Sequence, residues 1–132
     1  MHPEERDIGR SHTYNPVTPA VLDELRTIVG DAHVRIDRES IDTYSHDEIP
    51  DPRYAHDPEV VLLPKSAEEI SAIVRIANRD RIPITPRGAG SGLSGGAVPI
   101  HGGIVLLTDR MNRILEIDID NMIVVVEPGV VT

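Results

Sequence analysis

The sequence contains no cysteine, phenylalanine or tryptophan, and only three tyrosines. Without cysteine, the chain itself cannot form disulfides, thiolate zinc sites or iron–sulfur clusters. Because aromatic side chains are nearly absent, a buried core has to be built from Val, Ile and Leu, a composition typical of a parallel or mixed sheet covered by helices. The lack of cysteine also fits a reducing compartment, so we expect the protein to be cytoplasmic.

Basic residues are scarce too, since 13 Lys and Arg stand against 22 Asp and Glu and give a net charge of −9. This balance argues against a nucleic-acid partner, which requires a basic face. No apolar run approaches the roughly 20 residues that span a bilayer, so no membrane span is expected. A length of 132 residues suits one small domain.

The first part of the chain predicts helices and parallel strands. Residues 1–16 are polar and predict a flexible leader. A helix is expected from Thr18-Pro19 to Gly30, and a second one after the capping box at Ser66. This second helix lies between the apolar runs 59–63 and 82–85, an order that predicts a parallel βαβ unit. Its apolar stripe is predicted to consist of Ile70, Ile73, Val74 and Ala77.

The second part of the chain predicts strands only. An apolar run over residues 104–107 is one strand. Apolar and acidic residues then alternate over residues 115–120, and a second apolar run follows over 122–126. This pattern predicts an antiparallel hairpin over residues 113–127, with one dry and one wet face. Together the two parts indicate an α+β fold, a small parallel βαβ layer followed by antiparallel hairpin strands.

The glycine-rich loop is the strongest functional signal, since seven of the ten glycines lie between positions 88 and 103. Its core reads Pro86-Arg87-Gly88-Ala89-Gly90-Ser91-Gly92-Leu93-Ser94-Gly95-Gly96. Glycines let the backbone approach a ligand closely, and consecutive amides can converge on an anion. The loop also follows a predicted strand of the βαβ unit, where open sheets usually place ligands.

Two common phosphate-binding motifs do not fit this loop. Residues 90–95 match the pattern Gly-x-Gly-x-x-Gly, but a Rossmann site requires that pattern to open a helix, and Gly95-Gly96 and Pro99 leave no room for one. A Walker loop is excluded because Lys65 is the only lysine and does not follow a glycine. A purely structural loop remains the alternative interpretation.

Four segments of the chain carry a family resemblance. They are Leu63-Pro64-Lys65-Ser66-Ala67-Glu68-Glu69-Ile70, Pro86 to Ala97, Met111-Asn112-Arg113-Ile114-Leu115-Glu116-Ile117-Asp118 and Val126-Glu127-Pro128-Gly129-Val130. In this order they resemble the FAD-linked oxidases of the vanillyl-alcohol-oxidase (PCMH-type) superfamily, in particular the branch that contains the glycolate oxidase FAD subunit and D-lactate dehydrogenase. The resemblance covers about residues 40–132.

The resemblance implies that residues 17–132 are the N-terminal portion of an FAD-binding domain, with the remainder and the substrate cap beyond Thr132. It implies a flavin-dependent oxidoreductase acting on a 2-hydroxy acid such as glycolate or D-lactate. The catalytic base and the substrate residues would lie outside the chain, so the 132 residues alone are expected to be inactive. The alternative is a non-catalytic nucleotide-binding subunit or fragment completed by a partner chain, and an unfinished sheet edge would favour self-association.

The resemblance also assigns site residues. Arg87 would begin the diphosphate loop and pair with a phosphate or a local carboxylate. Pro64 would lie near the cofactor at a strand end, and Pro128-Gly129 would turn towards the adenine side. Some relatives attach the flavin to a His in the loop, but the matching position here is Ser91, so FAD binding is expected to be non-covalent. The diphosphate amides would come from Gly88, Ala89, Gly90, Ser91, Gly92, Leu93, Ser94 and Gly95.

One acidic and histidine-containing stretch raises the question of a metal. It contains His46, Asp47, Glu48, Asp51 and His56. Their spacing matches no standard metal site, and neighbouring residues in a polar loop are usually solvated. We therefore expect no metal ion.

Overall fold

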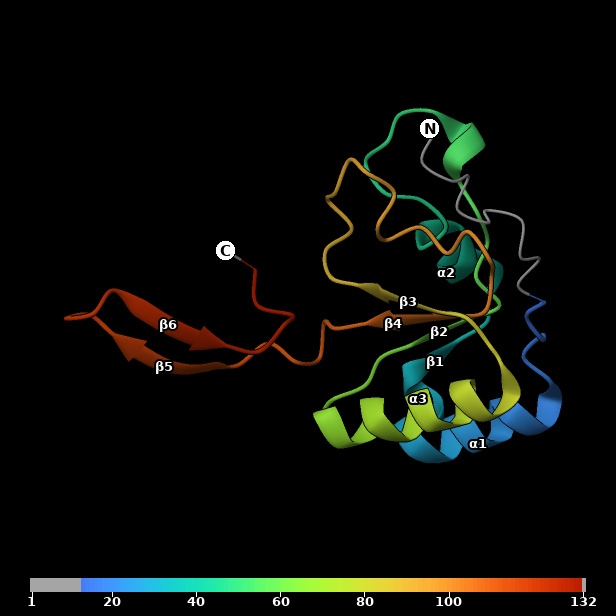
Figure 1. The fold of residues 1–132 in the computed structure, drawn as a ribbon, viewed down its shortest axis with the longest axis horizontal. Coiled ribbons are helices and arrows are strands. Elements are labelled where there is room, and N and C mark those ends of the chain that lie inside the picture. Colours follow the sequence, from blue (N-terminus) through green and yellow to red (C-terminus); the bar gives the residue numbers. More distant parts are fainter. Residues whose placement is uncertain (1–12, 132) are drawn as a thin grey trace, which may run out of the picture.

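The computed structural model describes residues 13–131 (Figure 1); of the predicted leader, residues 1–12 lie outside the described residues. A four-stranded sheet with the order β1-β2-β4-β3 forms the centre of the fold. Strand β1 runs antiparallel to β2, whereas β2 and β3 both run parallel to β4. The strands are β1 (Val34–Arg35), β2 (Val60–Leu62), β3 (Ile84–Arg87) and β4 (Ile104–Leu107).

Helices cover both faces of this sheet. Helices α1 (Pro19–Val29) and α3 (Ala67–Asp80) lie on one face, and the short α2 (Arg38–Thr43) lies on the other (Figure 1). The alternation along β4 explains the two layers, because Ile104 and Leu106 pack with α1 and α3, while Val105 and Leu107 pack with Ile41 of α2. Two short 3-10 helices, Asp31–His33 and Pro52–Tyr54, lie in the connections.

Both predicted helix starts are confirmed. Thr18 caps α1 by accepting a hydrogen bond from the Val21 amide, and Gly30 ends the helix at φ 86°. Ser66 caps α3 by accepting from the Glu69 amide. The Glu69 carboxylate reaches back to the Lys65 amide at 2.8 Å, one residue earlier than the usual capping box requires.

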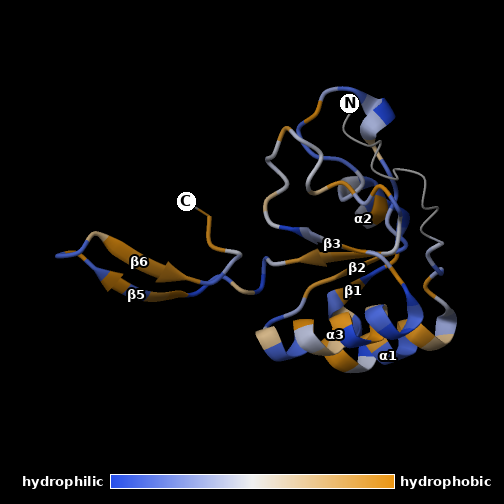
Figure 2. Ribbon diagram, viewed as in Figure 1, coloured by the Kyte–Doolittle hydropathy of each residue, from blue (hydrophilic) through white to orange (hydrophobic). Residues whose placement is uncertain are grey.

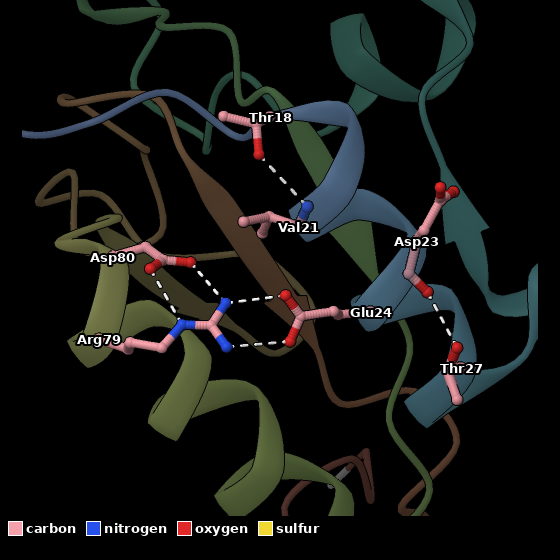
Figure 3. Close-up of polar contacts among 7 residues, drawn as sticks. All are labelled: Thr18, Val21, Asp23, Glu24, Thr27, Arg79 and Asp80. Carbon is pink, nitrogen blue, oxygen red and sulfur yellow. Dashed lines mark hydrogen bonds and ion pairs between the residues drawn. The ribbon is translucent and has the colours of Figure 1, made fainter.

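An exposed ion-pair group joins α1 to α3 (Figure 3). Arg79 contacts Glu24 at 2.8 Å and Asp80 at 2.7 Å. The hydrogen bonds from Arg79 hold the pKa of the Glu24 carboxyl below its usual value. Because these groups are exposed, the pair contributes little to stability.

The α+β prediction is confirmed, with one addition to the βαβ unit. Strands β2 and β3 flank α3 and are parallel, as expected, but β4 lies between them. The carboxyl ends of all three strands therefore meet at one edge of the sheet, the edge from which the glycine-rich loop leaves. Among residues 13–131, no helix combines the length and the apolar character that crossing a membrane requires.

The predicted hairpin is also present, as β5 (Ile114–Asp118) paired antiparallel with β6 (Ile123–Val126). It extends away from the four-stranded sheet, and its strands are strongly apolar (Figures 1 and 2). The expected dry face is not buried, since Ile117 is 65% exposed and Val124 is 56% exposed. That expectation is wrong for the described residues, because no element within 13–131 covers either face of the hairpin.

Candidate functional site

The glycine-rich loop connects β3 to β4 without any helix between Gly88 and Gly103. The Gly-x-Gly-x-x-Gly pattern therefore does not open a helix, and the structure lacks the Rossmann arrangement at this loop. The loop begins where β3 ends, at Arg87, whose carbonyl accepts a hydrogen bond from the Thr108 amide after β4. Its origin at the carboxyl edge of parallel strands agrees with the usual place for a ligand.

The segment after β6 folds back towards the same edge. The Gly129 amide donates to the Met111 carbonyl at 2.7 Å. A Cβ atom at position 129 would collide with the carbonyl oxygens of Thr108 and Met111, so only glycine permits this close backbone approach. Pro128 and Gly129 are thereby held beside the β4 end and close to the start of the glycine-rich loop.

Between these two segments lies a cavity of about 180 Å³, which we call the loop cleft. It is smaller than the roughly 300–1,000 Å³ of pockets that enclose a whole drug-sized ligand, so it suits one part of a dinucleotide. Five predicted site residues meet here, and Asp109 is the only ionisable side chain among the described residues that line the cleft. The lining residues are Gly88, Ala89, Ser91, Asp109, Pro128, Gly129, Val130 and Val131.

The remaining predicted site residues lie outside the cleft lining. Pro64 follows β2 at the same edge of the sheet and is fully buried. The preceding carbonyl, that of Leu63, accepts a hydrogen bond from Arg110 at 2.8 Å. The other predicted site residues belong to the glycine-rich loop, which begins at Arg87. They are Arg87, Gly90, Gly92, Leu93, Ser94 and Gly95.

The backbone of this loop is rich in available donors. From Gly88 to Ser94, no amide donates to a protein acceptor within residues 13–131. The next amide, that of Gly95, is used, because it donates to the Asp47 carboxylate at 2.9 Å. A Cβ atom at Gly88 or at Gly92 would meet no protein atom within 4 Å. Unpaired amides beside open space fit an anionic group such as a diphosphate.

One feature opposes an anion in the loop cleft. The exposed carboxylate of Asp109 is the only formally charged side chain of the lining within residues 13–131, and it carries the same sign as a phosphate. At a solvent-exposed position such repulsion is weakened by the high dielectric of water. The donors that the described cleft lining offers to an anion are therefore backbone amides and the Ser91 hydroxyl rather than a basic side chain.

Arg87 faces away from the loop cleft. Its side chain is only 8% exposed, and Nη1 donates to the His46 carbonyl at 2.6 Å. The guanidinium also lies 5.5 Å from the centre of the Tyr44 ring. The predicted carboxylate partner is not found among the described residues, where Arg87 donates to a backbone carbonyl, and pairing with a phosphate stays a prediction. A Cβ atom at Gly90 would collide with this guanidinium, and Gly90 has a φ of 71°.

Residues 46–48, in the segment before β2, contact the glycine-rich loop. These contacts were not predicted from the sequence. Asp47 is 5% exposed and accepts hydrogen bonds from the amides of Ile49 and Gly95, both at 2.9 Å. The Glu48 amide donates to the Gly92 carbonyl at 3.1 Å. Within residues 13–131, no group of three or more His, Asp or Glu side chains is arranged to hold a metal ion. One Asp47 oxygen accepts from the Gly95 amide of the glycine-rich loop, and the other accepts from the Ile49 amide of the segment before β2.

Comparison with known proteins identifies the domain. The model of the family described as FAD binding domain matches residues 58–132. The chain belongs to this family. FAD is therefore the cofactor of the domain, and the FAD-binding family expected from the four segments is confirmed.

Relatives of this FAD-binding domain are flavin-linked or hydroxy-acid enzymes by name. The chain is 47% identical over 89 residues to glycolate oxidase subunit GlcD of Bacillus subtilis, covering 67% of the chain and 18% of the relative. It is 38% identical over 119 residues to D-lactate dehydrogenase of Anaerostipes hadrus, covering 90% and 25%. With D-2-hydroxyglutarate dehydrogenase of Stutzerimonas stutzeri, it shares 40% over 114 residues, covering 86% and 24%. The chain thus spans a quarter or less of these relatives.

Solved structures show the same fold. Substrate-bound p-cresol methylhydroxylase superposes with a TM-score of 0.73 at 29% identity, covering 83% of this chain and 22% of that one. A 4-ethylphenol oxidase from Gulosibacter chungangensis gives a TM-score of 0.70 at 36% identity, covering 83% and 21%. These neighbours confirm the PCMH-type architecture of the domain.

Proposed function

We propose that the chain holds the diphosphate of FAD in the loop cleft, non-covalently, through the backbone of the glycine-rich loop. The observation that carries this proposal is the row of amides from Gly88 to Ser94 that have no acceptor among residues 13–131, beside a cleft at the carboxyl edge of parallel strands. Each hydrogen bond to a charged acceptor is worth roughly 1.5–3 kcal/mol, so a few such bonds account for tight binding. Pro128 and Gly129 form the opposite wall of the cleft.

The roles within the loop differ in this proposal. The diphosphate accepts first from the amides of the cleft-lining residues Gly88, Ala89 and Ser91, and the neighbouring amides up to Ser94 extend this row of donors. Gly95 is bonded to Asp47 and fixes the end of the loop. Ser91 lines the cleft and can add a hydroxyl donor. Arg87 acts beneath the loop rather than on the phosphate, because its guanidinium is bonded to the His46 carbonyl. Pro64 packs at the base of the same edge and stays a proposed cofactor neighbour.

The reaction we propose for the protein is oxidation of a 2-hydroxy acid such as glycolate or D-lactate. Three relatives named for glycolate, D-lactate and D-2-hydroxyglutarate support this substrate class. When bound, FAD supplies the two-electron acceptor. Among the residues that the structure describes, no His, Lys, Tyr or Arg lines the loop cleft. We therefore place the catalytic base and the substrate-binding groups outside residues 1–132, and we expect these residues alone to be inactive.

A second candidate is a nucleotide-binding subunit that a partner chain completes or that self-associates. The exposed apolar hairpin β5–β6 favours this candidate, since large exposed apolar patches mark interaction surfaces. Substrate-dependent flavin reduction, measured on residues 1–132 alone and on the complete gene product that carries them, discriminates the two candidates. An enzyme reduces its bound flavin when the hydroxy acid is added, whereas a nucleotide-binding subunit without its partner does not. The cytoplasmic location stays a prediction.

The test compares three flavins on the complete gene product that carries these residues. FAD, FMN and riboflavin are titrated by quenching of flavin fluorescence. If the loop binds a diphosphate, FAD should bind at least about 100-fold more tightly than riboflavin. Riboflavin carries no phosphate, so its complex lacks at least two charge-assisted hydrogen bonds that FAD makes. Equal affinity for FAD and riboflavin would refute the diphosphate role. Anaerobic reduction of the bound flavin by glycolate or D-lactate, and not by L-lactate, tests the substrate class.

A further inference from the structure

The segment before β2 contacts the glycine-rich loop at its beginning, middle and end. At the beginning, Arg87 donates to the His46 carbonyl at 2.6 Å. In the middle, the Glu48 amide donates to the Gly92 carbonyl at 3.1 Å. At the end, the Gly95 amide donates to the Asp47 carboxylate at 2.9 Å. These contacts connect residues more than 40 positions apart in the sequence, as the bond between His46 and Arg87 shows.

We propose that these residues form a clamp that sets the glycine-rich loop in its binding conformation before FAD arrives. The clamp consists of Tyr44, His46, Asp47, Glu48 and Arg87, and its central positioning residue is Asp47. This inference rests on the function proposed above, because it assigns the loop to the diphosphate of FAD. The clamp residues touch the loop and not the cleft, since none of them lines it.

The physical reason is the cost of ordering glycine. A loop with Gly88, Gly90, Gly92 and Gly95 loses more conformational freedom on ordering than a loop of other residues. If FAD had to order it, that cost would be subtracted from the binding free energy. The clamp contacts fix the beginning, the middle and the end of the loop when the protein folds. The entropy cost of ordering the loop is then part of the folding free energy, and the loop amides are already in place when FAD binds.

Burial shows that the clamp is built rather than incidental. Asp47 and Arg87 are two of the few buried polar or charged residues of the described chain. Each is satisfied by backbone groups: Asp47 accepts the Ile49 and Gly95 amides, and Arg87 donates to the His46 carbonyl. Because Arg87 also stacks beside Tyr44 and fills the space next to Gly90, the loop can pass over it only with glycine there.

The test uses two substitutions of Asp47 in the complete gene product. Asp47→Ala removes both acceptors, whereas Asp47→Asn keeps one oxygen and turns an NH₂ group towards one of the two amides. The matched control is Asp51→Ala in the same segment, whose carboxylate binds Arg53 and not the loop. Hydrogen exchange of residues 88–97 is measured without cofactor, and the dissociation constant of FAD is measured by fluorescence. Exchange in β4 reports whether the variant remains folded.

We expect faster exchange of the Gly95 amide, the loop amide that donates to Asp47, in both Asp47 variants, with β4 unchanged. FAD binding should weaken by about tenfold in Asp47→Asn and about 100-fold in Asp47→Ala, which is the value of one and two charge-assisted bonds. Asp51→Ala should match the unsubstituted protein in both measurements.

Loop exchange that stays at the unsubstituted rate in folded Asp47→Ala would overturn the clamp, as would unchanged FAD affinity. Faster loop exchange together with faster exchange in β4 would also count against it, because Asp47 would then support the whole fold. If the unsubstituted protein does not bind FAD, the proposed function fails, and with it the role of the clamp towards a cofactor. The exchange rates without cofactor separate that failure from a failure of the clamp itself.

Discussion

Substituting Gly88 by valine tests whether the loop cleft binds the diphosphate of FAD, and it should leave the stability of the protein nearly unchanged. Gly88 lines the cleft, and a Cβ atom there would meet no protein atom within 4 Å. Its φ lies outside the left-handed region, so a side chain causes no backbone strain. We therefore expect a stability change within about 0.5 kcal/mol, as for other surface substitutions.

The expected effect on FAD is far larger. A valine side chain would occupy the space in which the diphosphate meets the first loop amides, and two charge-assisted bonds of roughly 1.5–3 kcal/mol each would be lost. At 1.4 kcal/mol per tenfold, FAD binding should weaken by about two to four orders of magnitude. Fluorescence titration measures the dissociation constant, and thermal unfolding without FAD measures stability.

Two comparisons make the result specific. Gly96→Val is the matched control, because Gly96 also has open space around its Cβ position and does not line the cleft. Gly90→Val is a poor probe, since Gly90 has a φ of 71° and its side chain would collide with Arg87. A Gly88→Val protein that binds FAD as tightly as the unsubstituted protein would show that the diphosphate lies elsewhere.

Three further outcomes follow from the same geometry. Asp109→Asn should tighten FAD binding a few-fold, and less at high salt, because it removes a negative charge from the cleft lining; unchanged affinity at low salt would place the diphosphate away from Asp109. Ile117→Lys should reduce self-association of the 132-residue chain in sedimentation velocity, because Ile117 is 65% exposed on the apolar hairpin; identical sedimentation would argue against the hairpin as the contact. Arg79→Ala should raise the pKa of Glu24 towards its usual 4.5, seen by NMR titration. Because the folded-state pKa is lowered, the stabilisation by Arg79 is present at neutral pH and is lost as the pH falls through that pKa; an unshifted Glu24 would refute the contact.

Local signals in the sequence predicted which helices and strands form, but not which residues of α3 are buried or where β3 begins and ends. The Ser66 capping box correctly marks the start of α3, because a cap depends on neighbouring residues only. The predicted stripe of α3 included Val74, which is 36% exposed, whereas Ile76 is 9% exposed. Both fit an apolar stripe, and only packing against α1 and the sheet decides between them. Strand β3 likewise lies two residues later than predicted, since pairing with β4 continues to Arg87.

The site was predictable where it depends on glycine and unpredictable where it depends on distant contacts. Glycine spacing after a strand located the loop, and the comparisons confirm FAD as the cofactor. The role of Asp47 left no local pattern, because its partner Gly95 is 48 positions away and the contact joins a side chain to a backbone amide. Hairpin pairing followed from alternation, but burial of its dry face did not, because burial requires another element to cover it.

Amide-resolved hydrogen exchange by NMR shows whether the amides from Gly88 to Ser94 donate to the diphosphate of FAD. Without cofactor, these amides should exchange rapidly, whereas the Gly95 amide should already be protected by Asp47. Adding FAD should protect several amides between Gly88 and Ser94 and leave Gly95 nearly unchanged. FAD binding that leaves exchange from Gly88 to Ser94 unaltered would contradict the account.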